Sequence, residues 1–135
     1  MIFIKEIIAM LLLTANMFSD KIPFKEENIF KIKTTAYCTG TITATGKEPR
    51  VGICAGKKEW LGKLVFVFEN NDGEIGNFIG CWECEDTGFG TDKDGDGIGT
   101  IQEGKVIDMY FPTYEECKEW MKLTNGEIYV EIWEK

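Results

Sequence analysis

The chain of 135 residues contains no histidine and a single serine, Ser19. The absence of histidine excludes zinc sites built on His, Ser-His-Asp triads and Cys-His dyads. If the chain is an enzyme, carboxylates must therefore carry the acid and base chemistry.

Basic residues are also in short supply, since 15 Lys and Arg stand against 23 Asp and Glu and the net charge is -8. Contacts to phosphates dominate the affinity of proteins for nucleic acids, so an acidic chain without a basic stripe is not expected to bind them. The same charge gives no electrostatic attraction to an anionic membrane surface. A neutral polymer such as a glycan, or a cation, is the expected partner.

No apolar run is long enough to span a bilayer. The longest, residues 7–15, is far shorter than the roughly 20 residues of a spanning helix and fits the apolar region of a secretory signal peptide. We expect residues 1–19 to be a signal peptide or N-terminal anchor and residues 20–30 to be a linker. The protein would then be secreted or held in the cell envelope, with no other membrane association. An N-terminal helix packed on the domain is the alternative.

Five cysteines suit an exported protein with one or two disulfides and one thiol left over. Cys81 and Cys84 form a lone C-x-x-C pair, which is weak evidence for zinc because a structural site needs four ligands. Unpaired cysteines in the core are the alternative, since Cys packs as a small hydrophobe.

The 15 glycines predict many tight turns. Alternating or β-branched apolar segments predict about seven strands, over residues 31–37, 41–45, 51–55, 64–69, 75–85, 105–111 and 127–133. One helix is expected, because Thr113 and Glu116 form a capping box and Asn125-Gly126 is a stop signal. The pattern predicts a mainly β domain over residues 31–135, a compact barrel or sandwich with one short C-terminal helix.

Two aspartates occur where aspartate is locally unfavourable. Asp108 interrupts an apolar strand, where a carboxyl group must be paired, hydrogen-bonded or protonated, with a raised pKa. Asp86 directly follows a strand, where its side chain can face a cleft. The alternatives are a strand residue that faces solvent for Asp108 and a turn-opening residue for Asp86.

These aspartates belong to a series of short motifs that runs through most of the chain. In order, the motifs are Thr35-Ala36-Tyr37, Thr43-Ala44-Thr45-Gly46, Leu61-Gly62-Lys63, Glu85-Asp86-Thr87-Gly88 and Val106-Ile107-Asp108-Met109-Tyr110-Phe111. From about residue 33 to 133 the chain thereby resembles the three-aspartate (3D) domain family of peptidoglycan-cleaving lytic transglycosylases.

The resemblance implies a small double-psi β-barrel that acts on peptidoglycan glycan strands. The family cleaves the MurNAc–GlcNAc bond without water, leaves a 1,6-anhydro end and needs no cofactor for this chemistry. By resemblance, Asp108 is the main catalytic carboxyl group and Asp86 its partner. Tyr37, Thr45 and Trp82 are the expected substrate-binding residues, the aromatic ones as stacking surfaces for sugar rings. Aromatic side chains that fill the core are the alternative.

The chain departs from the family where Ala55 stands in place of the first aspartate. Glu59 is close enough in sequence to compensate. Loss of one of three acids favours the alternative function, a catalytically impaired glycan-binding or structural cell-wall module.

A second departure is an insertion between the two aspartates, residues 92–103. It fits the EF-hand loop rule, with acids at positions 1, 3 and 5, glycine at 6 and glutamate at 12. We expect a structural Ca²⁺ here, and a solvated acidic hairpin tip is the alternative. The predicted ligands are Asp92, Asp94, Asp96, Ile98 through its carbonyl, Thr100 and Glu103.

Overall fold

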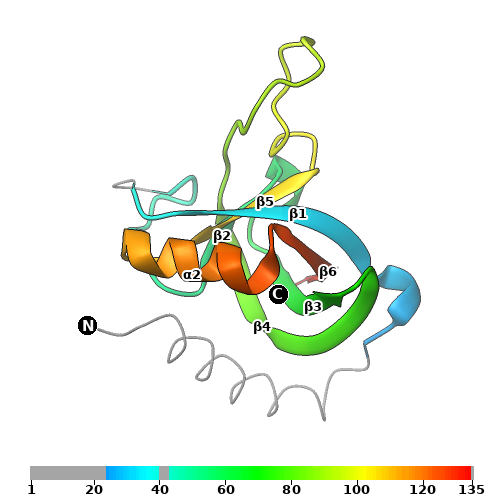
Figure 1. The fold of residues 1–135 in the computed structure, drawn as a ribbon. Helices are drawn as coiled ribbons and strands as arrows, with labels where there is room; N and C mark the ends of the chain where they lie inside the picture. The colour runs from blue at the N-terminus through cyan, green and yellow to red at the C-terminus, as the bar shows by residue number, and fades with distance from the viewer. Residues whose placement is uncertain (1–23, 40–42, 135) are drawn as a thin grey trace.

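The computed structural model describes residues 24–39 and 43–134, so the predicted leader, residues 1–19, lies outside the described residues. The described chain is mainly β, with one α-helix and two short 3-10 helices (Figure 1). The elements are η1 (Glu26–Asn28), β1 (Phe30–Tyr37), β2 (Ile53–Ala55), η2 (Lys58–Trp60), β3 (Leu64–Asn71), β4 (Glu74–Asp86), β5 (Val106–Tyr110), α2 (Tyr114–Thr124) and β6 (Glu127–Trp133).

The strands form a closed barrel in the order β1-β5-β2-β4-β3-β6. Two pairings are parallel, β1 with β5 and β2 with β4, and the other four are antiparallel. Exchanging β1, β2 and β3 with β4, β5 and β6 reproduces every pairing, so the barrel has an internal two-fold pattern. The connections from β1 to β2 and from β4 to β5 join corresponding strands of the two halves, as in a double-psi barrel. The predicted small β-barrel with one short helix is confirmed.

The described residues form six strands, one fewer than expected. The described part of segment 41–45 is a turn rather than a strand, and residues 41 and 42 lie outside the described residues. The Thr43 amide donates to the carbonyl of Lys47, and the Thr45 amide donates to the carbonyl of Glu85. Because these bonds close a local turn, the threonine-rich segment joins no ladder despite its β-branched composition.

Alternating side chains of the strands fill the barrel, as the pattern of β5 shows. Ile107 and Met109 are fully buried, while Asp108 between them is only partly buried. Helix α2 lies beside β1 (Figure 1), and its Trp120 packs on Trp82 with ring centroids 5.4 Å apart. Trp120 also donates its indole N–H to the Thr34 hydroxyl at 3.0 Å, which satisfies the polar group that it buries.

Strand β3 is apolar on both faces because each face is covered. Val65 and Val67 point into the barrel core, while Phe66 and Phe68 pack with Phe24 at centroid distances of 5.3 Å. Phe24 belongs to the predicted linker, so at least this part of segment 20–30 is attached to the barrel. Within the part of the chain that the structure describes, no helix is long and apolar enough to cross a membrane.

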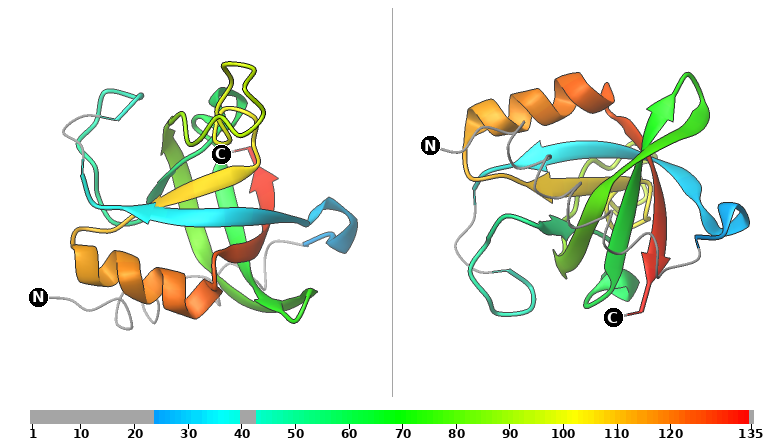
Figure 2. Two further views of the ribbon diagram at one scale, coloured as in Figure 1. Left: turned by 45° about the horizontal axis from the view of Figure 1, so that its top comes forward. Right: turned by 90° about the horizontal axis from the view of Figure 1, so that it is seen from below.

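The connection from β4 to β5 rises away from the barrel as a long loop (Figures 1 and 2). Its base is narrow, because Thr100 and Thr91 exchange backbone and side-chain hydrogen bonds of 2.9 and 3.0 Å. Gly99 is required at this point, since a Cβ there would lie 1.8 Å from the carbonyl oxygen of Phe89. The predicted calcium loop forms the outer part of this projection.

Candidate active site

Four residues form a continuous row across neighbouring strands of the barrel. Thr35 on β1 is the register partner of Asp108 on β5. Ala55 on β2 is the register partner of Asp108 on one side and of Asp86 on the other. Since adjacent strands lie about 4.8 Å apart, the two aspartates are separated by the width of the single strand that carries Ala55. The structure thus brings together the two acids that the sequence predicted.

Asp108 is a partly buried carboxyl group with one fixed oxygen. The Thr35 hydroxyl donates to Oδ1 at 2.9 Å, and among the described residues none donates to Oδ2. Burial raises the pKa of Asp108 to about 6, with the charge of Asp86 adding to the rise and the Thr35 hydrogen bond opposing it. Asp108 can therefore hold or release a proton close to neutral pH.

Asp86 is fixed by three donors from three separate segments. The amides of Ala44 and Thr87 donate to Oδ1 at 3.0 and 2.9 Å, and the Tyr37 hydroxyl donates to Oδ2 at 3.3 Å. Its position at the end of β4 gives it the amide of the next residue, and the connection 38–52 supplies the amide of Ala44. Asp86 is thus a positioned hydrogen-bond acceptor next to the more weakly bonded Asp108.

Tyr37 extends the site along β1, two residues beyond Thr35. Burial raises the pKa of its phenol far above the usual range, and the charges of Asp86 and Asp108 raise it further, so the hydroxyl stays protonated and acts as a donor. Its ring meets that of Tyr110 edge to face at 5.4 Å. The predicted substrate-binding residue Tyr37 therefore lies beside both carboxyl groups.

The loop that supplies the Ala44 amide is clamped to β4 by a buried glutamate that sequence reasoning missed. Glu85 is 1% exposed, binds the Arg50 guanidinium and accepts from Lys47 at 3.2 Å. Arg50 first, and then Lys47, hold the pKa of Glu85 below its ordinary value. Glu85 directly precedes Asp86 in β4, so the two side chains point to opposite faces of the strand. A carboxylate in a buried position is the one signal that could have identified Glu85.

An open pocket lies at the Asp86 end of the row. It has a volume of about 460 Å³, and the residues around it include Ala44, Gly56 and Thr87. Ala44 and Thr87 are the two residues whose amides hold Asp86, and Gly56 follows Ala55. Neither Asp86 nor Asp108 is among the lining residues, so the pocket borders the backbone that holds Asp86.

The other two predicted substrate-binding residues have different outcomes. Thr45 has an exposed side chain on the clamped loop, one residue from the Ala44 amide. Trp82 is 1% exposed and packs against Trp120 in the core, so its predicted role as a stacking surface is wrong. Trp82 and Cys84 share a face of β4 by strand alternation, and that face points into the barrel.

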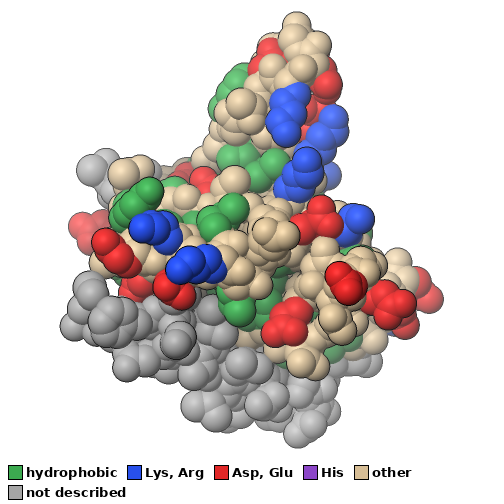
Figure 3. Space-filling model, viewed as in Figure 1, with side chains coloured by type: hydrophobic (Ala, Val, Ile, Leu, Met, Phe, Trp, Pro, Cys, Tyr) green, Lys and Arg blue, Asp and Glu red, His purple; other side chains and the backbone are tan. Residues whose placement is uncertain are grey.

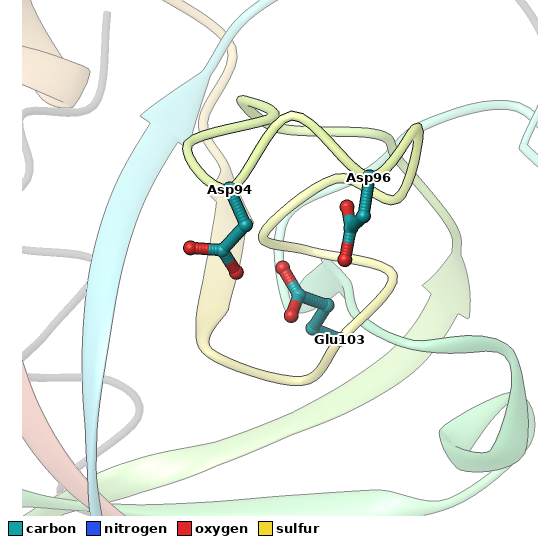
Figure 4. A group of neighbouring side chains, drawn as sticks. All are labelled: Asp94, Asp96 and Glu103. Atoms are coloured by element: carbon teal, nitrogen blue, oxygen red, sulfur yellow. The ribbon is translucent and has the colours of Figure 1, made fainter.

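Three of the predicted calcium ligands converge at the projecting loop (Figure 4). Ligand oxygens of Asp94, Asp96 and Glu103 all lie within 4.8 Å of one another. Lys105 pairs with Glu103 at 3.0 Å and with Asp94 at 3.5 Å, and Figure 3 shows lysines and acids together on this projection. The cluster can bind a cation, and an internal ammonium group already meets two of its carboxylates.

The remaining predicted ligands lie outside this group of three carboxylates. Asp92 accepts from the amides of Asp96 and Gly97 at 3.1 and 2.8 Å, and the Gly97 amide above all lowers its pKa. The Thr100 side chain is buried and accepts from the amide of Thr91, so it holds the base of the loop. Ile98 is 47% exposed at the loop surface.

The fold and the row that contains Asp108 and Asp86 define the molecule as a small closed β-barrel with a candidate acid–base site beside the end of one parallel strand pair, β2 with β4. No protein-family model matches the chain, and neither does any curated protein. The resemblance to the 3D family therefore depends on the short sequence motifs alone.

Proposed function

We propose that this protein is a glycan-cleaving enzyme of the lytic transglycosylase type, acting on peptidoglycan strands in the cell envelope or outside the cell. The observation that carries the proposal is the environment of Asp108. It is a partly buried carboxyl group with a pKa of about 6 and one oxygen without a donor among the described residues. The motif resemblance to the 3D family supports the same assignment.

Asp108 supplies both proton transfers in this proposal. Its protonated form gives a proton to the glycosidic oxygen as the bond from C1 to that oxygen breaks. The resulting carboxylate then takes the proton of the C6 hydroxyl of the same sugar while that oxygen forms its bond to C1. A pKa close to the working pH makes one group effective in both directions.

Asp86 is a positioned negative group for the charge that develops on the sugar. The oxocarbenium-like centre of glycoside cleavage carries positive charge, which a nearby carboxylate stabilises. The amides of Ala44 and Thr87 and the hydroxyl of Tyr37 fix Asp86 before substrate arrives, so little reorganisation is needed during the reaction. The pocket at Ala44 and Thr87, next to the backbone that holds Asp86, is the proposed position of a neighbouring part of the glycan.

Ala55 favours a second candidate function, a glycan-binding cell-wall module that no longer cleaves its ligand. Its small side chain is the register partner of both acids, so the centre of the row carries a methyl group where the family has a carboxylate. Glu59 is the exposed middle residue of the neighbouring 3-10 helix η2 and is the predicted substitute for the missing carboxylate.

The two functions are separated by the products formed from purified peptidoglycan. The full chain is incubated with sacculi, and the soluble material is analysed by mass spectrometry for anhydro-ended muropeptides. The enzyme proposal expects such products from the parent chain, their loss in Asp108→Asn, and normal yield in the exposed control Glu48→Gln. If a folded parent chain releases no products and still sediments with the sacculi, the protein is a binding module.

The loop of residues 92–103 adds a structural Ca²⁺ to the proposal. The support is the sequence rule together with the convergence of Asp94, Asp96 and Glu103. Binding would move these carboxylates from Lys105 to the ion. A ligand that binds only the folded protein at about 100 times its Kd adds about 2.7 kcal/mol of stability. We expect Ca²⁺ to raise the Tm of the parent chain more than equal Mg²⁺ does, and to leave the Tm of Asp96→Ala unchanged. Equal melting of the parent chain with Ca²⁺ and with a chelator would exclude the site.

A further inference from the structure

Four of the five cysteines meet in pairs, and the first pair joins two neighbouring strands. Cys54 on β2 and Cys84 on β4 are direct register partners in a parallel ladder. Both are fully buried in the barrel core, and each thiol shifts the pKa of the other. Neighbouring strands lie about 4.8 Å apart, within the Cα separations that a disulfide accepts, about 4.4–6.8 Å.

The second pair joins the end of β1 to the helix. Cys38 directly follows β1, and Cys117 is a buried residue of α2. Cys38 packs against the core cluster that contains Cys117, and after burial the neighbouring Cys38 thiol is the main cause that raises the pKa of Cys117. Cys81 has a different environment, because its thiol points to the Trp82 carbonyl at 3.9 Å. Strand alternation places Cys81 and Cys84 on opposite faces of β4.

We propose that Cys38–Cys117 and Cys54–Cys84 are two disulfide sites and that Cys81 is the one remaining thiol. The oxidant for each bridge is an external disulfide such as oxidised glutathione. One protein thiolate attacks that disulfide, forms a mixed disulfide and releases one external thiol. The second protein thiolate then displaces the other external thiol, so two electrons and two protons pass from the protein to the oxidant.

The environments of the thiols assign an order to the two reactions. Because Cys54 and Cys84 are 0% exposed, an external disulfide meets them before the barrel closes. Cys38 is only partly buried, so the bridge to Cys117 can also form in the folded protein.

Both bridges lie next to the row of carboxyl groups. Cys38 follows Tyr37, Cys54 precedes Ala55, and Cys84 is two residues before Asp86. The bridges therefore fasten β1 to α2 and β2 to β4 at the points where the site residues begin. This assignment does not depend on the proposed reaction, since it follows from the positions of the thiols.

The experiment maps the linkages of the full chain after oxidative refolding. The reduced, unfolded chain is refolded in mixed reduced and oxidised glutathione, alkylated, and digested with trypsin and a protease that cleaves after glutamate. Cleavage after Glu83 separates Cys81 from Cys84, which share a tryptic peptide. We expect linked peptides for 38–117 and 54–84, with alkylation of Cys81 alone. The control Cys81→Ser is expected to give the same two linkages.

Two further measurements test the assignment of the two disulfides. Cys38→Ser is expected to leave Cys117 alkylated and the 54–84 linkage intact. Complete reduction of the parent chain is expected to lower its Tm by on the order of 10 °C. Three results would overturn the proposal. They are a linkage through Cys81, an exchange of partners between the two pairs, and alkylation of all five cysteines in a refolded chain that has the circular dichroism of the native protein.

Discussion

Replacement of Asp108 by asparagine is expected to stabilise the protein at alkaline pH while it removes the proposed activity. The folded protein raises the pKa of Asp108 to about 6, and an unfolded chain has a value of about 3.9. Keeping this carboxyl group ionised therefore costs the folded state at most about 3 kcal/mol. Because the side chain is partly exposed, solvent screening reduces the cost to about 1–2 kcal/mol.

The pH dependence has a definite sign. A raised pKa means that the folded state binds the proton more tightly, so its advantage is complete below about pH 4 and is lost as the pH rises through about 6. Asparagine has no charge to desolvate, and its side-chain oxygen can still accept from the Thr35 hydroxyl. The variant and the parent chain should therefore be similarly stable at about pH 4, and the variant should be more stable by about 1–2 kcal/mol at about pH 8.

The measurement is urea denaturation followed by tryptophan fluorescence at both pH values. Glu48→Gln provides the control, because Glu48 is exposed on a loop, and a difference of less than about 0.5 kcal/mol from the parent chain is expected at either pH. A variant Asp108→Asn that is less stable than the parent chain at about pH 8, or that differs from it equally at both pH values, would refute the reasoning.

Two other substitutions test the packing that holds the site. Thr34→Val removes the acceptor of the buried Trp120 indole N–H and should cost about 1–3 kcal/mol by urea denaturation. The control Thr91→Val replaces an exposed threonine and should change stability by less than about 0.5 kcal/mol. Equal effects of the two substitutions would contradict the role of this hydrogen bond. Gly99→Ala places a methyl group against the Phe89 carbonyl and should cost about 1–3 kcal/mol, with faster amide exchange at the base of the loop. Unchanged stability and exchange would show that the loop accommodates the methyl group without rearrangement.

The sequence predicted the elements of this barrel more completely than their pairing. The alternation of apolar and polar residues predicted the six strands, and the capping box together with Asn125-Gly126 predicted α2. Both signals are local in the sequence. The parallel ladder of β1 with β5 joins residues far apart in the chain, and no local pattern encodes such a register. Only the resemblance to a known family implied the double-psi arrangement.

The candidate site was predictable where a residue was locally out of place. Asp108 interrupts an apolar strand and Asp86 ends one, and both lie in the row of carboxyl groups. The Ala44 amide gave no signal, because any residue there would donate the same backbone hydrogen bond. Trp82 was misassigned because an aromatic ring in a strand can pack in a core or stack on a sugar equally well. Only its position two residues before the apolar Cys84, on the same face of the strand, indicates that it points into the barrel.

The barrel can close only after β6 has been synthesised. β1 pairs only with β5 and β6, and β3 depends on β6 for one of its two ladders. Until Glu127–Trp133 leaves the ribosome, the growing chain therefore exposes two open strand edges, which are templates for aggregation. Such distant pairing also slows folding. Deletion of β6 (Glu127–Trp133) should therefore lower the solubility of the protein, because it leaves both strand edges open.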